Sequence, residues 1–153
     1  MAEKIKKSIN KPGKQNPANK RAPAAEGLAP YLNARTLPDL KDFSYHDFKR
    51  IADKVNFTQA EWSAILHLSE RTLQRYAKSN NNFAPMNAER ALQMAALLKK
   101  GKEVLGSEEK FYQWLKREPY SLEGNLSMES LTTAAGITQV FTQLGRIEHG
   151  LFT

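Results

Sequence analysis

Residues 58–77, TQAEWSAILHLSERTLQRYA, are typical of two short helices joined by a tight turn. The first helix is expected over residues 59–66. Its start is marked by Thr58 and Glu61, which form a capping box: each side chain accepts a hydrogen bond from the other residue's backbone N–H. The three residues that follow this helix are too few for anything but a turn. Ser69 is a suitable N-cap for a second helix, because its hydroxyl can accept a backbone N–H of the first turn.

The second helix, expected over residues 70–78, has an inner and an outer face. Leu73 and Tyr76 are expected to face inward. The outer face carries long hydrogen-bond donors suited to a DNA major groove. The predicted base-reading residues are Arg71, Gln74 and Arg75, and the predicted phosphate-binding residues are Gln59, Thr72 and Lys78. An ordinary helical pair within an all-α core is the alternative interpretation.

Apolar residues at spacings of three and four predict further helices on both sides of this pair. We expect one helix that begins near Ser44, a long helix capped by Asn87 and running to about Val104, and three shorter helices after Gly106. No segment shows convincing strand alternation. The predicted fold class is therefore all-α.

The charge of the chain is unevenly distributed. Residues 1–40 hold eight lysines and arginines, three acidic residues and five prolines, whereas residues 103–153 hold four basic and seven acidic residues. With few large apolar side chains, the first segment cannot bury enough surface to offset the entropy of ordering, so we predict a disordered basic arm. The net charge of +7 favours contact of the front half with phosphates. A solvated tail with ordinary surface charge is the alternative.

Several classes of protein are excluded or disfavoured by composition. The chain has no cysteine, so it holds no disulfide and no thiolate metal site. Its three histidines lie in different predicted elements without metal-binding spacing, and it has no nucleophile elbow or glycine-rich phosphate loop. We therefore expect no enzyme, no cofactor and no metal. Without a run of about 20 apolar residues or a signal peptide, a cytoplasmic protein is expected.

The two central helices resemble the helix-turn-helix of the Xre/lambda-repressor-like proteins. In that family the position of His67 is usually glycine, because its φ angle tends to be positive. Residues 107–152 resemble the C-terminal toxin-binding domain of Xre/MbcA/ParS-type antitoxins. The matching residues are Glu109-Lys110, Trp114-Leu115, Pro119, Gly124, Leu131, Gly136, Val140 and the block from Leu144 to Gly150. The segment SERTLQR at residues 69–75 is also typical of these antitoxins.

The chain is expected to have three parts. Composition predicts a disordered basic arm over residues 1–40. The resemblance predicts an Xre-like helix-turn-helix domain over residues 41–105 and a helical toxin-binding domain over residues 106–153. It implies an antitoxin of a type II toxin–antitoxin system, which binds and silences a RES-domain toxin encoded beside it. Such toxins consume NAD. The family commonly also binds operator DNA and represses its own operon.

The end of the last helix suggests how the toxin would be silenced. Polar groups there stand beside a glycine and two apolar residues, a combination that can plug a cleft while charged groups pair with its walls. Our hypothesis is that this tip covers the toxin's active site, where NAD binds. The predicted toxin-binding residues are Arg146, Glu148, His149, Gly150, Leu151 and Phe152. For the polar residues, a solvated helix end is the alternative.

Two other functions remain open at this point. A stand-alone helix-turn-helix repressor would use its rear domain to dimerise or to sense a ligand. A chromosome-partition or architectural protein would bind DNA without sequence preference. A homodimer is expected in each case, because helix-turn-helix readers usually act in pairs.

Overall fold

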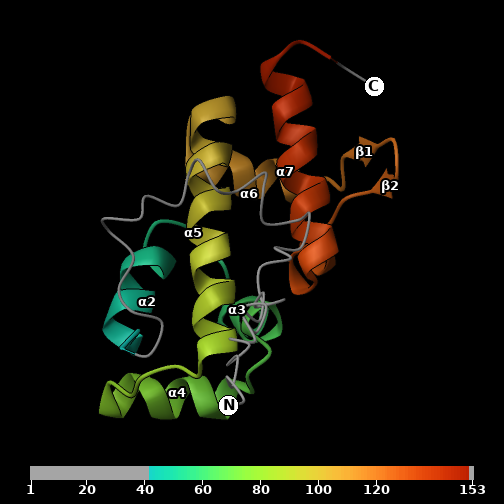
Figure 1. The fold of residues 1–153 in the computed structure, drawn as a ribbon. Coiled ribbons are helices and arrows are strands. Elements are labelled where there is room, and N and C mark those ends of the chain that lie inside the picture. The colour runs from blue at the N-terminus through green and yellow to red at the C-terminus, as the bar shows by residue number, and fades with distance from the viewer. Residues whose placement is uncertain (1–41, 152–153) are drawn as a thin grey trace, which may run out of the picture.

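The computed structural model describes residues 42–151, so the predicted basic arm and Phe152 lie outside the described residues. The described part is helical apart from one small hairpin, which confirms the all-α prediction (Figure 1). In chain order the elements are α2 (Tyr45–Ala52), α3 (Gln59–Leu66), α4 (Glu70–Ser79), α5 (Pro85–Leu105), α6 (Glu108–Lys116), β1 (Tyr120–Ser121), β2 (Gly124–Asn125), the 3-10 helix η2 (Met128–Thr132) and α7 (Ala134–Glu148).

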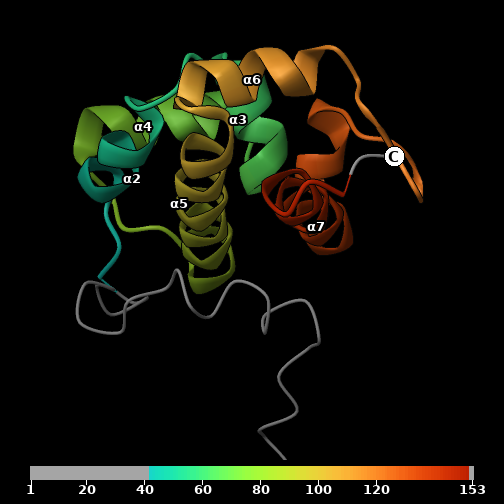
Figure 2. The ribbon, with the colours of Figure 1, turned by 90° about the horizontal axis from the view of Figure 1, so that it is seen from above.

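The long helix α5 occupies the centre of the molecule (Figures 1 and 2). It contacts α2 and α3 from the front half of the chain and α6 and α7 from the rear half. Ala88 and Ala91 are fully buried on α5, and such small side chains let neighbouring helices approach closely. As a result, one continuous apolar core extends from Phe43 to Leu144 and joins the two halves of the chain.

The predicted helical pair is confirmed in detail. Thr58 and Glu61 form the expected capping box at the start of α3, with the Thr58 N–H donating to the Glu61 carboxylate at 2.9 Å. His67, which follows α3, has a φ of 57° and occupies the left-handed region that glycine usually fills. Ser69 caps α4, because its hydroxyl accepts the Thr72 N–H at 3.1 Å.

The predicted start of the long helix is wrong. Asn87 does not cap α5, which instead begins at Pro85 with Ala84 in the N-cap position. Proline suits the first helical turn, because its fixed φ is helical and its missing N–H would have no partner there. The Asn87 side chain has another role: its Nδ2 donates to the Leu66 carbonyl at 2.6 Å, which satisfies an acceptor at the end of α3.

A short hairpin is present where no strand was expected. β1 and β2 pair antiparallel, with Tyr120 opposite Asn125 and Ser121 opposite Gly124. Each strand has two residues, which is too short for alternation to be recognised in a sequence. The hairpin connects α6 to η2 and stands at the side of the helical bundle (Figure 1).

Candidate functional site

Helix α4 forms the lower edge of the molecule (Figure 1), and its outer face consists of exposed, mostly polar residues. Leu73 is the buried residue of this helix and fixes its inner face against the core. The Arg75 guanidinium lies 5.7 Å from the centre of the Tyr76 ring, within the range of a cation–π contact. Four predicted DNA-binding residues are exposed together here: Arg71, Gln74, Arg75 and Lys78. Their long donors can reach into a groove of nucleic acid.

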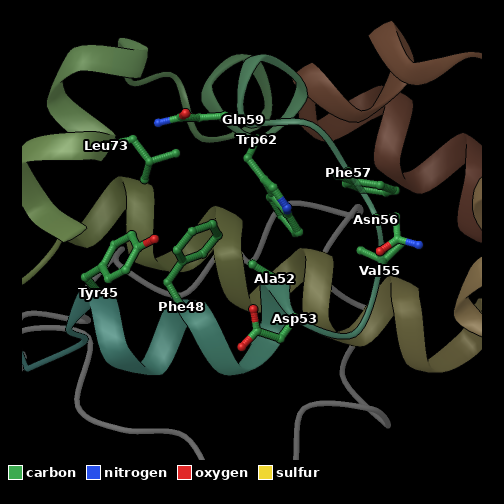
Figure 3. A pocket seen from close by; sticks show the side chains of 10 residues that line it. All are labelled: Tyr45, Phe48, Ala52, Asp53, Val55, Asn56, Phe57, Gln59, Trp62 and Leu73. Atoms are coloured by element: carbon green, nitrogen blue, oxygen red, sulfur yellow. The ribbon is translucent and has the colours of Figure 1, made fainter.

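The two remaining predicted DNA-binding residues differ from these four. Thr72 is half-buried, and its hydroxyl accepts a hydrogen bond from the Ser69 hydroxyl at 2.8 Å, so it also helps to cap α4. Gln59 is exposed at the start of α3 and lines an open groove of about 540 Å³. Figure 3 shows its side chain extending towards Leu73 of α4. The groove is lined by Tyr45, Phe48, Ala52, Asp53, Val55, Asn56, Phe57, Gln59, Trp62 and Leu73.

The end of α7 forms a second candidate site. Gly150 has a φ of 71°, and its N–H donates to the Ile147 carbonyl at 3.1 Å. The Leu151 N–H donates to the Arg146 carbonyl at 2.7 Å, which completes a Schellman motif and confirms the predicted glycine stop. This motif fixes the direction of the chain after the helix and leaves the Leu151 side chain 62% exposed.

The predicted toxin-binding residues at this tip have different surroundings. Arg146 is half-buried, whereas His149 is exposed, with 74% of its side chain accessible. Glu148 forms an ion pair with Lys100 of α5, whose side chain is only 6% exposed. The Lys100 ammonium also lies 5.9 Å from the centre of the Phe141 ring. Glu148 is therefore engaged within the chain, where it ties the last turn of α7 to α5.

The Lys100 ammonium also determines the ionisation of its partner. Its hydrogen bond and its charge lower the pKa of Glu148 from the ordinary value of 4.5, against a smaller opposing effect of burial. A group whose pKa is lowered by folding stabilises the folded state above its unfolded pKa. That stabilisation is lost as the pH falls through the folded pKa.

Glu148→Gln is expected to lower the midpoint of thermal unfolding at pH 7 by a few degrees, because it removes the carboxylate charge that pairs with Lys100. Asp53→Asn is the matched control, since the Lys49–Asp53 pair is exposed on both sides and should contribute little. Circular dichroism melts over a pH series measure the difference. The difference in melting midpoint should narrow as the pH falls through the lowered, folded-state pKa of Glu148, because below that pKa the carboxyl group is protonated in both states. A difference that stays constant with pH would contradict this account.

The helix α3 is joined to the rear half of the chain near both of its ends. Near its start, Glu61 accepts hydrogen bonds from Lys116 at 2.6 Å and from the Tyr112 hydroxyl at 3.3 Å. Burial opposes the ionisation of Glu61, but the hydrogen bonds from Lys116 and from the Thr58 N–H lower its pKa overall. The helix-turn-helix is thus held by the rear half, and does not pack on α5 alone.

A second set of contacts joins η2 to the turn after α3, through His67, and to α5, through Arg90. The His67 Nε2 donates to the Thr132 carbonyl at 2.6 Å, since a carbonyl can only accept. The Arg90 guanidinium donates to the Leu131 carbonyl at 3.5 Å. A glycine in place of His67 would make no side-chain hydrogen bond here, so this contact offsets part of the cost of the left-handed backbone.

Lys100 is a residue of this site that the sequence analysis did not identify. A signal for its burial was present. It follows the buried Leu97 by three positions on α5, and its partner Glu148 follows the buried Leu144 by four positions on α7. A lysine and a glutamate that both fall on apolar helix faces are candidates for a buried pair.

The two candidate sites lie at opposite ends of α5, with α4 at the lower end and the tip of α7 at the upper end in Figure 1. With 21 residues, α5 is about 30 Å long. Among residues 42–151, no group of three or more His, Asp or Glu side chains is placed to hold a metal ion. Within the same residues, no helix has the length and apolar character that crossing a membrane requires.

Comparison with known families gives a match to each half of the chain. Residues 41–96 match the antitoxin Xre-like helix-turn-helix domain. Residues 100–150 match the antitoxin Xre/MbcA/ParS C-terminal toxin-binding domain. A comparison with curated proteins found no match. The first match contains all of α4, and the second contains α6, the hairpin and α7 and ends at Gly150, one residue before Leu151.

Proposed function

Because this chain belongs to the Xre/MbcA/ParS-type antitoxins of toxin–antitoxin systems, we propose that its partner is a RES-domain toxin that consumes NAD, in a type II system. The observation that carries this proposal is the match of residues 100–150 to a toxin-binding domain, which the exposed Leu151 directly follows. The choice of a RES-domain toxin is supported by the sequence resemblance at the Leu144–Gly150 block.

The tip of α7 neutralises this toxin by covering its active site. Leu151, and after it Phe152, exclude water from the NAD pocket, and burial of each contributes about 1.5–3 kcal/mol. Arg146 lies in the last turn of α7 and His149 directly follows that helix, so their charged or polar ends can pair with groups in the pocket wall. Glu148 acts through Lys100 and keeps the last turn of α7 in one orientation.

Co-expression with the RES-domain protein encoded beside this chain tests the partner directly. A complex that remains intact through affinity and size-exclusion chromatography is the expected result. If the two proteins elute separately at micromolar concentration, the proposed partner is wrong. The same preparation gives the stoichiometry of the complex.

We also propose that the chain represses its own operon by binding operator DNA as a homodimer. The exposed row Arg71, Gln74, Arg75 and Lys78 on α4 supports DNA contact, and two copies would place their α4 helices in successive major grooves. Because α4 and the tip of α7 lie at opposite ends of α5, one molecule can hold DNA and toxin at the same time (Figure 1).

Arg75→Ala is expected to weaken operator binding by about 1–3 kcal/mol, because it removes a side chain that can bond two atoms of one base. Lys99→Ala is the control: it also removes one exposed positive charge, but from the rear half of α5. Fluorescence anisotropy with the promoter fragment of the operon measures the affinity of both variants for DNA. Equal affinity of the two variants would count against α4 as the DNA-reading helix.

A further inference from the structure

Large apolar side chains are exposed at four places within residues 42–151. Their exposed fractions are 83% for Met86, 69% for Tyr120, 67% for Leu122 and 62% for Leu151. Leu151 belongs to the tip of α7. Tyr120 in β1 and Leu122 in the turn after it are two positions apart on the hairpin, within the region that matches a toxin-binding domain. Single exposed apolar residues are ordinary, but an adjacent pair on a projecting hairpin requires an explanation.

The backbone of the hairpin holds these two side chains outward. Between them lies Ser121, which is 3% exposed and whose hydroxyl donates to the Gly124 carbonyl at 2.8 Å. Successive residues of a strand point to opposite sides, so the burial of Ser121 directs Tyr120, its neighbour in β1, to solvent. Leu122 follows in the turn of the hairpin and is itself exposed. At the base of the hairpin, the Leu126 N–H donates to the Pro119 carbonyl at 2.9 Å, and Leu126 is 1% exposed.

The position of the hairpin indicates which partner this pair meets. In Figures 1 and 2 the hairpin and α7 lie on the same side of α5, and α2 lies on the other side. The hairpin also stands apart from α4, which forms the lower edge in Figure 1. An exposed acidic residue, Glu123, lies in its turn and disfavours contact with phosphates. An apolar surface of a protein fits this hairpin better than DNA does.

We propose that Tyr120 and Leu122 form a second contact with the toxin, separate from the tip of α7. The inference rests on the proposed function, because it takes the toxin as the partner of residues 100–150. Tyr120 and Leu122, here called the hairpin patch, insert into an apolar depression on the toxin surface outside its NAD pocket. Tyrosine is frequent at the energetic centres of protein interfaces, since its ring buries a large area and its hydroxyl can still find a partner. Two separated contacts also fix the orientation of the toxin, because a single contact leaves it free to rotate about that point.

The double variant Tyr120→Ser/Leu122→Ser in the full chain tests this contact. Both side chains are exposed, so its thermal unfolding should match that of the unaltered chain. Its Kd for the purified neighbouring RES-domain protein, measured by isothermal titration calorimetry, is expected to rise about 10- to 100-fold. Met86→Ser is the matched control, because it removes a still more exposed apolar side chain near the α4 end, and should leave the Kd within about twofold.

The outcomes separate this inference from the proposed function. If the unaltered chain does not bind the RES-domain protein, the proposed function fails. If the unaltered chain binds and the double variant binds equally well, only the second contact is overturned. Light scattering on the same samples gives a further outcome: an unchanged Kd with a lower oligomeric state would assign the hairpin patch to self-association and would also overturn the inference.

Discussion

A chain that ends at Glu148 is expected to lose neutralisation of the toxin while remaining folded. The cut removes His149, Gly150, Leu151, Phe152 and Thr153 and keeps the ion pair between Glu148 and Lys100. Loss of the two apolar contacts should weaken binding by about 3 kcal/mol or more, which is at least roughly 100-fold in Kd. The measurement is NAD consumption by the toxin against the concentration of the truncated chain.

The position of the cut determines what this experiment reports. Ending the chain after Leu144 would also remove Glu148, whose ion pair with Lys100 holds α7 on α5. A loss of neutralisation could then result either from the missing toxin contacts or from weaker packing of α7. Deleting Thr153 alone is the matched control and should leave neutralisation unchanged. A folded chain ending at Glu148 that neutralises as well as this control would show that the tip is not the inhibitory element.

Gly136→Ala is expected to destabilise the chain by about 3 kcal/mol. A Cβ atom at Gly136 would lie 1.9 Å from the carbonyl oxygen of Ser130 and 2.7 Å from its carbonyl carbon. These are backbone atoms of η2, so the overlap is relieved only by moving η2 and α7 apart, and forced overpacking typically costs 1–3 kcal/mol, occasionally more. Urea unfolding followed by circular dichroism gives the free energy of unfolding.

Gly145→Ala supplies the control on the same helix. A Cβ atom at Gly145 would meet no atom within 4 Å, so the substitution should gain up to about 1 kcal/mol from alanine's higher helix propensity. The free energy of unfolding should therefore fall in Gly136→Ala and rise in Gly145→Ala. Similar stability of both would mean that η2 and the first turn of α7 do not pack as closely as described.

The helix-turn-helix was predictable because its signals are local. The capping box of Thr58 and Glu61, the N-cap Ser69 and the positive φ of His67 each depend on residues within a few positions. The glycine stop at Gly150 is of the same kind. Local patterns decide such features before tertiary contacts form, so the sequence was sufficient for them.

The errors and omissions arise where distant contacts decide the outcome. Asn87 has the chemistry of a cap, but the Leu66 carbonyl, 21 positions away, takes its side chain, and Pro85 starts the helix earlier. Lys100 is buried because α7 packs on α5 and brings Glu148 to it across 48 positions. Neither pairing can be derived from spacing within one helix.

The candidate sites were predicted in part. Four of the six predicted DNA-binding residues share the exposed face of α4, while Thr72 also helps to cap that helix and Gln59 approaches from α3. Glu148 was grouped with the toxin-binding residues, and the structure gives it a partner within the chain. Binding of DNA and toxin by these residues remains a prediction, as does the domain boundary between residues 105 and 106.

NAD consumption by the neighbouring RES-domain protein, measured with and without the full chain, tests the central claim most directly. The account predicts that consumption stops once the chain is added in a stoichiometric amount, together with formation of a stable complex. Undiminished NAD consumption in the presence of excess folded chain, with no complex formed, would contradict it.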